Sequence, residues 1–317
     1  MSRFQKRKIA EFVSAHDYPC WCGTRAATVF CAQMFRRKFV ALACEACGTH
    51  RILPRALHTQ SEATDVYNLE EHTRAVIPNS VLEENARKIL ERIQQVGIVF
   101  AGGKTVIDIG CSDGLLIDTI RERWSCQVIG VDVDQRSIHL ARQKYPNVNF
   151  IHGRFDEVID TLPAADVVIA SAILEHVTSP PEFLSMLKHL LKPGGQLFLL
   201  TPNSESRNYR IQRSWWRELL AIGEHIYLFG PRSIGILADQ AGLETRTMAT
   251  AYDPTILRFG IRSPKELIVL CWSLVRYSVQ RLCQLKGDDL KGDILSVRLE
   301  HQPDRAVAAL KSPTESL

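Results

Sequence analysis

The chain has 317 residues, of which 45% are hydrophobic and 23% charged, and its formal net charge is +4. This composition is ordinary for a soluble globular protein, and the mild charge argues against the clustered basic surface of a typical nucleic-acid-binding protein. The longest apolar run, Leu267 to Val275, is too short to span a bilayer, which takes about 20 residues.

The cysteine content indicates the compartment. The chain has nine cysteines, an odd number, and several of them fall inside predicted strands or helices. Such a pattern argues for a reducing environment rather than for a disulfide framework. We therefore expect a cytoplasmic protein that has no nucleic-acid partner.

The N-terminal segment contains five of the nine cysteines. Four of these form two close pairs, and a glycine follows each pair. Two such pairs of thiolates can bind a tetrahedral zinc ion. The first pair has a spacer of one residue, which strains the turn, and Cys31 is an alternative ligand; a reduced module with unliganded cysteines is the other interpretation. The predicted structural zinc ligands are Cys20, Cys22, Cys44 and Cys47.

Between about residues 78 and 250, short β-rich runs alternate with helical patterns, which is typical of a parallel sheet with crossover helices. The spacing of apolar residues predicts helices over Val81–Gln95 and Pro231–Gly242. A third helix, Pro181–Leu191, is expected to end at the Pro193-Gly194-Gly195 turn. The predicted strands are Thr105–Ile109, Val128–Val131, Val148–Ile151, Asp166–Ala170, Gln196–Thr201 and, near the C-terminal end, Ile294–Leu299.

The first of these strands contains Asp108 and passes into a turn bounded by Gly110 and Gly114. Glycine permits positive φ and a close approach of the backbone to a ligand. The second strand ends near Asp132, at about the 20-residue spacing with which such folds bind a ribose diol. The turn lacks the central glycine that admits a pyrophosphate, so a nicotinamide-dependent oxidoreductase is the weaker interpretation.

Four blocks in order make this pattern specific: Asp108 to Gly114, Gly130-Val131-Asp132, Ala170 to Val177, and Leu191 to Gly195. Together they resemble the class I S-adenosylmethionine-dependent methyltransferases, and within these the small-molecule branch that includes the ubiquinone-pathway O-methyltransferases. The resemblance covers about Val81 to Glu244. It implies an α/β fold, with a seven-stranded, mostly parallel Rossmann-like sheet and helices on both faces, after a small cysteine-rich module.

The resemblance implies a role for each residue of the site that binds S-adenosylmethionine. Asp132 would accept hydrogen bonds from both ribose hydroxyls, and Asp108 would orient the ammonium end. Val133 and Phe155 would sandwich the adenine. The alternative role for Asp132, as the N-cap of the next helix, suits Asp134 better. The implied cofactor-binding residues are Asp108, Gly110, Cys111, Gly114, Asp132, Val133, Phe155 and Ser171.

Two positions depart from the family pattern. Arg154 stands where many members have an acid that accepts a hydrogen bond from the adenine amino group. Because arginine cannot accept, the backbone of Arg154 and Phe155, or Asp156, would make this contact. Ala172 stands where the ubiquinone-type enzymes have a glutamate that helps to hold a divalent metal. The sequence therefore argues against a magnesium-dependent catechol mechanism.

Glu175 and His176 follow the fourth strand, where donor and acceptor meet in this fold. Methyl transfer is an in-line displacement that depends mostly on positioning, and a nearby base helps a hydroxyl acceptor. His176 titrates in the useful pH range and is the predicted catalytic base; the alternative is a histidine that holds the loop. The resemblance implies O-methylation of a small molecule in secondary, sugar or quinone metabolism. A non-catalytic interaction protein is the alternative.

Other segments lie outside these motifs. The Thr201-Pro202-Asn203 turn is predicted to be a substrate-side loop. A helix over Pro264–Leu285, inside a helical insertion near 256–285, fits a membrane-surface contact, or a cap on the core or on the second subunit of a homodimer.

The sequence divides into three predicted parts. These are a zinc-ribbon-like segment at 1–60, similar to one that precedes some bacterial methyltransferases, the methyltransferase domain at 61–300, and a flexible tail at 301–317.

Overall fold

The residues group into two compact units that do not follow the order of the chain. The first unit contains the described residues of 20–53, 201–234 and 249–295, and the second those of 78–200, 235–248 and 296–301. We describe each unit by itself, and the domain boundaries at residues 60 and 300 stay predictions. The computed structural model describes residues 20–24, 27–34, 37–53, 78–212, 225–251, 290 and 292–301.

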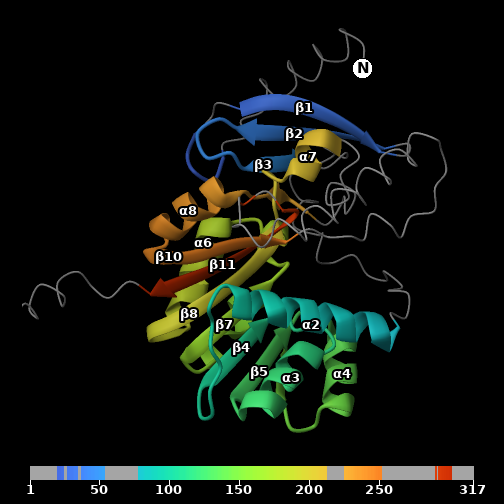
Figure 1. Ribbon diagram of the computed structural model, residues 1–317, viewed down its shortest axis with the longest axis vertical. Helices are drawn as coiled ribbons and strands as arrows, with labels where there is room; N and C mark the ends of the chain where they lie inside the picture. Colours follow the sequence, from blue (N-terminus) through green and yellow to red (C-terminus); the bar gives the residue numbers. More distant parts are fainter. Residues whose placement is uncertain are drawn as a thin grey trace, which may run out of the picture. The chain divides into compact units, whose positions relative to one another are not determined.

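A seven-stranded sheet with the order β10-β11-β8-β7-β4-β5-β6 forms the second unit (Figure 1). The pairs β4–β5, β4–β7, β5–β6 and β7–β8 are parallel, so the carboxyl ends of these strands share one edge of the sheet. The predicted α/β class and mostly parallel sheet are confirmed. The strands are β4 (Thr105–Ile109), β5 (Gln127–Asp132), β6 (Asn149–His152), β7 (Ala165–Ser171), β8 (Leu191–Pro202), β10 (Leu243–Ala251) and β11 (Ile294–His301).

The centre of this sheet is covered on both faces. Every residue of β4 is buried, and Val167 to Ala170 of the neighbouring β7 are fully buried. Strands that are buried on both faces have continuous apolar runs rather than an alternating pattern. This is why the sequence pattern identified these central strands.

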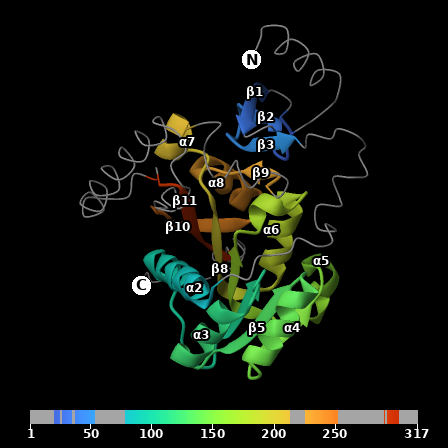
Figure 2. The same cartoon turned by 90° about the vertical axis from the view of Figure 1, so that its right-hand side faces the viewer.

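Helices cover both faces of the sheet (Figures 1 and 2). The predicted helices Val81–Gln95 and Pro231–Gly242 correspond to α2 and α8, and each begins or ends within two residues of its predicted bounds. The helices are α2 (Asn79–Gln95), α3 (Leu115–Trp124), α4 (Gln135–Lys144), α5 (Phe155–Val158), α6 (Pro180–His189), α7 (Arg207–Gln212) and α8 (Pro231–Gln240), with short 3-10 turns at Ile159–Thr161 and Leu174–His176.

One helix end differs from the prediction. Helix α6 stops at His189, and the residues from Leu191 already belong to β8. The pairing of β7 with β8 shifts register between Ala165 and Val167. A Cβ at Gly195 would lie 3.0 Å from the carbonyl oxygen of Ala165. The Pro-Gly-Gly segment therefore forms an irregular strand start, at which only glycine fits.

Strand β10 was missed by the sequence analysis. It contains a run of four polar residues, Glu244 to Thr247, and several of its residues are only partly buried. A strand near the end of a sheet carries little of the continuous apolar signal that marks the central strands. Its place in the sheet, next to β11, comes from tertiary pairing.

The first unit contains a four-stranded antiparallel sheet with the order β1-β2-β3-β9. Strands β1 (Ala27–Met34), β2 (Arg37–Cys44) and β3 (His50–Leu53) form a meander around the cysteine turns. The fourth strand, β9 (Tyr227–Leu228), comes from the segment after β8 and pairs with β3. The cysteine-rich segment thus completes its sheet with a strand from far along the chain.

Several predictions fall outside the described residues. These are the helix Pro264–Leu285 with its proposed membrane or subunit contact, the insertion near 256–285 and, apart from His301, the tail at 301–317. Among the helices that the structure describes, none combines the length and the apolar character needed to cross a bilayer.

Candidate functional site

The glycine turn between β4 and α3 is folded tightly onto β5. The amides of Gly110 and Cys111 both donate to the carbonyl of Val131, at 2.7 and 3.0 Å. Gly110 and Gly114 have φ of +80°, in the left-handed region that glycine enters without strain. The turn therefore brings its backbone to the carboxyl edge of the sheet, as the sequence predicted.

The two glycines are needed for packing as well as for their backbone angles. A Cβ at Gly114 would lie 2.4 Å from the ring of Phe150, and one at Gly110 would lie 2.3 Å from Ile173. Gly114 thus permits the close packing of α3 on the sheet, which is a known use of glycine in such turns. Ile173, which the sequence analysis did not select, covers Gly110.

The carboxylate of Asp132 is held by two backbone amides at the end of β5. One oxygen accepts from the amide of Ser112 at 2.8 Å, and the other accepts from the amide of Asp134 at 2.8 Å. Asp134 is the residue that caps α4, because its side chain accepts from the amide of Arg136. The N-cap role therefore belongs to Asp134, and Asp132 is oriented beside the glycine turn.

Asp108 lies on β4 and is only 3% exposed. Burial raises the pKa of its carboxyl group to about 8, and the nearby carboxylates of Asp132 and Asp113 add to this effect. One oxygen of Asp113 is buried and has no hydrogen-bond partner in the described part of the chain. Three carboxyl groups around one turn favour a cationic ligand, which would offset their mutual repulsion.

Cys111 is a packing residue of the turn. It is 5% exposed, and burial raises the pKa of its thiol. Its sulfur lies only 2.8 Å from the position that a Cβ on Gly130 would take. The thiol is therefore neutral, and it fills the space between the turn and β5.

Val133 and Phe155, the predicted adenine contacts, differ in exposure. Val133 is 38% exposed, which is unusual for a large apolar side chain in this unit, and Phe155 is partly buried at the start of α5. The ring of Phe155 lies edge-on to Phe183, with centroids 5.6 Å apart. Arg154 pairs with Asp156 at 3.0 Å, so these two side chains compensate each other's charge.

The end of β7 brings together three predicted residues. Ser171 ends the strand, and Ala172 adopts φ of +55°, a strained value for a residue other than glycine. Glu175 is 1% exposed and His176 is partly buried in the 3-10 turn that follows. Their ligand atoms lie within 4.8 Å of each other. The amide of His176 donates to the carbonyl of Ile173 at 2.9 Å, which fixes the turn.

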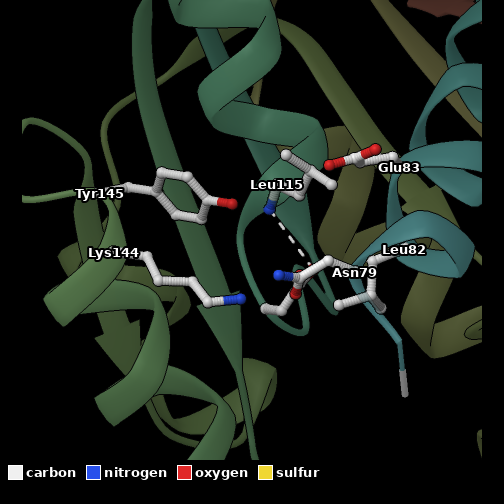
Figure 3. Close-up of a pocket in the computed structure, with 7 residues that line it drawn as sticks. Asn79, Leu82, Glu83, Leu115, Lys144 and Tyr145 are labelled. Atoms are coloured by element: carbon white, nitrogen blue, oxygen red, sulfur yellow. Dashed lines mark hydrogen bonds between the residues drawn. The ribbon is translucent and has the colours of Figure 1, made fainter.

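A cavity of about 300 Å³ lies between α2, the start of α3 and the end of α4 (Figure 3). The side chains of Lys144 and Tyr145 point toward the first turn of α3, whose Leu115 amide donates to Asp113 at 3.4 Å. The cavity reaches the glycine turn at Asp113, but none of the predicted site residues is among those that line it. It is lined by Asn79, Leu82, Glu83, Asp113, Leu115, Lys144 and Tyr145.

In the first unit, the four predicted zinc ligands lie together. Their sulfur atoms are all within 4.8 Å of one another, with Cys20 and Cys47 at 3.5 Å and Cys22 and Cys44 at 3.6 Å. Cys20 and Cys47 share one proton, so their hydrogen bond lowers the pKa of Cys47 to about 5 and raises that of Cys20. Cys31 lies on β1, and its side chain is outside the described residues.

Both cysteine pairs are held by tight turns. The amide of Gly23 donates to the carbonyl of Cys20, and that of Gly48 donates to the carbonyl of Cys44, each at 2.9 Å. The two glycines have φ of +82° and +79°. Glycine at these angles lets the one-residue spacer of the first pair form a turn like that of the second.

The predicted substrate-side loop ends with Asn203, whose side chain is hydrogen-bonded inside the protein. Asn203 is 0% exposed, and its side-chain amide donates to the carbonyls of Leu290 and Gly292 at 3.0 and 2.8 Å. Its side-chain oxygen accepts from the amide of Glu205. Asn203 therefore connects segments of its own unit and leaves no polar group for a substrate.

Two residues of this unit escaped the sequence analysis. The hydroxyl of Tyr209, on α7, lies 3.0 Å from Nδ1 of His50, and the ring centroids are 5.2 Å apart. Burial lowers the pKa of His50 to about 4, so the imidazole is neutral and can accept the tyrosine proton. The two residues are 159 positions apart in the chain, and no local pattern predicts their contact.

Comparisons with known proteins support one family. Residues 81–247, just over half of the chain, match the family model described as "Methyltransferase domain". The chain is 30% identical over 176 residues to the Ubiquinone biosynthesis O-methyltransferase of Pseudomonas paraeruginosa (strain DSM 24068 / PA7), covering 52% of this chain and 75% of the relative. The protein of the same name from Dechloromonas aromatica is 28% identical over 170 residues, or 50% of this chain and 73% of the relative.

Two solved structures of low sequence identity also match part of the chain. A putative methyltransferase from Bacillus halodurans C-125 is 14% identical with a TM-score of 0.49, and covers 68% of this chain and 100% of its own. A SAM dependent methyltransferase from Archaeoglobus fulgidus is 18% identical with a TM-score of 0.46, and covers 71% of this chain and 100% of its own.

Proposed function

This chain belongs to the methyltransferase-domain family and is a class I S-adenosylmethionine-dependent methyltransferase, and we propose that it methylates a hydroxyl group of a small molecule. Curated relatives at about this identity carry the name O-methyltransferase, which supports an oxygen acceptor. Secondary, sugar or quinone metabolism supplies acceptors of this kind. Membership of the family favours this proposal over a nicotinamide-dependent oxidoreductase and over a non-catalytic interaction protein.

The donor site that we propose rests above all on the geometry of Asp132. Its carboxylate is oriented by the amides of Ser112 and Asp134, so it can accept the ribose hydroxyls without the cost of fixing its own rotamer. Asp108, buried beside it, takes the ammonium end of the donor. These assignments agree with the chemistry of the site, since S-adenosylmethionine carries a sulfonium and an ammonium charge into a group of carboxylates.

Other predicted donor residues have supporting roles. Gly110 and Gly114 keep the turn close to the sheet, and Cys111 fills the space beneath it. Val133 offers an exposed apolar surface for one face of the adenine, and Phe155 offers a ring for the other. Because Arg154 pairs with Asp156, the adenine amino group would be recognised by backbone carbonyls of this loop. Ser171 ends β7 at the same edge of the sheet.

His176 is the base that we propose for the acceptor hydroxyl. It lies at the carboxyl edge of the sheet, in the turn after β7, and its backbone is fixed by the bond to Ile173. The methyl group of the donor supplies the electrophile, and the histidine takes the proton that the hydroxyl loses. Glu175, next to His176 in the chain, is almost fully buried, and we assign it a structural role rather than a catalytic one.

We also propose that Cys20, Cys22, Cys44 and Cys47 hold a structural zinc ion. Zinc–sulfur bonds of about 2.3 Å in a tetrahedron place sulfur atoms about 3.8 Å apart. The two closest sulfur pairs, at 3.5 and 3.6 Å, fit this spacing. Four protein thiolates leave no open position for a substrate, so the ion would act in folding rather than in methyl transfer.

Calorimetry with S-adenosylmethionine tests the donor site. Asp132→Ala is expected to weaken binding by about 100-fold, because it removes charge-assisted hydrogen bonds to both ribose hydroxyls. Asp134→Ala is the matched control, since it removes a neighbouring carboxylate that serves α4. Equal affinity of Asp132→Ala and the unchanged protein, or no binding by either, would refute the assignment.

A product assay tests the acceptor chemistry. The protein is incubated with donor and a panel of hydroxylated and aminated small molecules, and products are identified by mass spectrometry. We expect transfer to oxygen, and we expect His176→Gln to lower kcat more than it changes donor affinity. Transfer to nitrogen or carbon alone would contradict the proposal.

Metal analysis of the purified protein tests the zinc site. We expect about one equivalent of zinc per chain.

A further inference from the structure

The segment between β8 and α8, residues 203–230, is joined to the cysteine turns by main-chain pairing. Strand β9 of this segment pairs with β3, so His50 lies opposite Leu228 and Arg51 opposite Tyr227. The amide of Ile52 also donates to the carbonyl of Ile226 at 2.8 Å. Strand β3 begins three residues after Cys47, so the position of β9 depends on the geometry of the cysteine turn.

Side chains add a second connection. The hydroxyl of Tyr209 is hydrogen-bonded to Nδ1 of His50 at 3.0 Å, and its ring packs against Ile52 and Leu228. Arg51, next to His50, lies over the ring of Tyr227 at 5.9 Å. Helix α7 therefore contacts β3 through the side chain of Tyr209, and strand β9 contacts β3 through main-chain hydrogen bonds.

A third connection involves Glu205, which stands between two glycines. Its carboxylate lies 4.0 Å from the position that a Cβ on Gly48 would take, and 2.4 Å from that of Gly230. Gly48 is the glycine that closes the second cysteine turn. The side chain of Glu205 thus lies between Gly230, at the far end of the segment, and Gly48 of the second cysteine turn.

By contrast, the first residue of the segment is held without the cysteines. Asn203 binds Leu290 and Gly292, and its amide donates to the carbonyl of Asp293 at 2.7 Å. The segment is therefore fixed at its origin by buried amide bonds, and further along by β3 and the cysteine turns. If the turns loosen, Glu205, Tyr209 and β9 lose their support while Asn203 keeps its own.

We propose that metal bound at Cys20, Cys22, Cys44 and Cys47 controls the order of residues 205–212 and 225–230, while donor binding does not depend on it. The proposal rests on the proposed zinc site. Glu205 and Tyr209 are then the residues through which the cysteine turns hold this part of the chain.

Hydrogen–deuterium exchange on the full-length protein tests this proposal. The protein is compared as purified, after removal of metal by a chelator, and after return of Zn²⁺ alone. We expect amide exchange in peptides from 205–212 and 225–230 to become at least about tenfold faster without metal, and to recover with Zn²⁺. Exchange in β4 and β5, and the calorimetric affinity for S-adenosylmethionine, are expected to stay within about twofold.

Two variants separate the metal from the contacts that transmit its effect. Tyr209→Phe keeps the ring and the metal but removes the hydrogen bond to His50, so exchange is expected to rise in 205–212 with the zinc content unchanged. Cys126→Ser is the matched control, because this buried cysteine of the second unit donates only to the carbonyl of Ala101, a bond that serine can keep. It is expected to change neither zinc content nor exchange in the segment.

The outcomes are distinct. Unchanged exchange in 225–230 after metal removal would overturn the proposal, and so would a protein that binds no zinc. A fall in donor affinity on metal removal would also overturn it, since the donor site would then depend on the cysteines. Failure of the donor assignment appears separately, as absent binding of S-adenosylmethionine in the metal-loaded protein.

Discussion

The carboxyl edge of the seven-stranded sheet, called the donor edge because we propose that the donor binds there, and the cysteine turns of the β1–β2–β3–β9 sheet are held in different ways. At the donor edge, Gly110 and Gly114 fit against apolar side chains, and Asp132 is oriented by backbone amides of adjacent residues. In the other unit, the described contacts that join distant segments are mostly polar: four thiols, the amide of Asn203 and the His50–Tyr209 pair. Apolar packing dominates in one region, and in the other specific polar bonds join distant segments alongside the packing of Tyr209 on Ile52 and Leu228.

The largest loss of folding stability is expected at Asn203, whose side-chain hydrogen bonds join distant segments of the first unit. Asn203→Ala removes the side-chain donor to the buried carbonyl of Gly292 and to the partly buried carbonyl of Leu290, and the acceptor of the Glu205 amide. We expect it to lower the free energy of unfolding by about 4 kcal/mol, since each unsatisfied buried group costs about 1–3 kcal/mol. Urea unfolding measures the change. A loss below about 1 kcal/mol would mean that apolar packing also holds this unit.

A methyl group at Gly114 should be nearly as costly in the packed region. Gly114→Ala adds a Cβ against Phe150 and forces alanine into φ of +80°, and we expect a loss of about 3 kcal/mol. Gly103 and Gly23 have similar φ and nothing within 4 Å of the added Cβ, so Gly103→Ala and Gly23→Ala should each lose only about 1 kcal/mol. Equal losses at all three positions would show that backbone strain, not packing, limits the donor edge.

Asp108 should trade stability for donor binding. Its folded pKa of about 8 lies above the ordinary value of 3.8, so the unliganded protein loses stability as pH rises from about 4 to about 8. Asp108→Asn should remove this loss and stabilise the unliganded protein by about 2 kcal/mol at pH 7.5, as measured by thermal unfolding. A lower melting temperature for Asp108→Asn would contradict this interpretation.

The same group predicts the pH dependence of donor affinity. Below pH 8 the ammonium end of the donor must bind a carboxylate that first releases its proton. Affinity should therefore rise about tenfold between pH 6 and pH 7.5, with proton release visible by calorimetry in buffers of different ionisation enthalpy. Asp108→Asn should bind more weakly and lose this dependence. A flat profile in the unchanged protein would argue against contact between Asp108 and the ammonium group.

The smallest effect is expected at a polar cluster on the packed sheet. Glu300, on β11, accepts from Gln196 and Arg246 at 3.0 and 2.7 Å and also pairs with Arg298. Partial burial raises the pKa of Glu300, but these hydrogen bonds outweigh it and bring the value to about 2. Its contribution is therefore present above about pH 4.5 and is lost as pH falls toward 2.

Glu300→Gln tests this contribution by thermal unfolding at two pH values. We expect a loss of about 1 kcal/mol at pH 7 and almost none at about pH 1.5, which lies below the folded pKa of about 2, because the carboxyl group of the unchanged protein is then largely protonated. An equal loss at both values would mean that the shape of the side chain, rather than its charge, matters here.

Local patterns in the sequence predicted the central strands, the glycine turn and both cysteine pairs. Each has a short-range physical cause: β4 and β7 are buried on both faces and read as apolar runs, and a turn at positive φ needs glycine. The pattern failed for β10, which is partly exposed, and for the Pro-Gly-Gly segment, which forms a strand start instead of a helix end. It also assigned Asn203 to a substrate-side loop, although the side chain is entirely buried.

The sequence by itself therefore determined the family, the donor-binding turn and the residues able to bind a metal, because these depend on residue types at short, fixed spacing. Tertiary structure alone decided which distant residues meet: His50 with Tyr209, Glu205 with Gly48, and β3 with β9. Such contacts arise when separate segments are brought together by folding, and each partner on its own looks like an ordinary polar residue. The proposed dependence of residues 205–212 and 225–230 on the cysteine turns could be inferred only from those contacts.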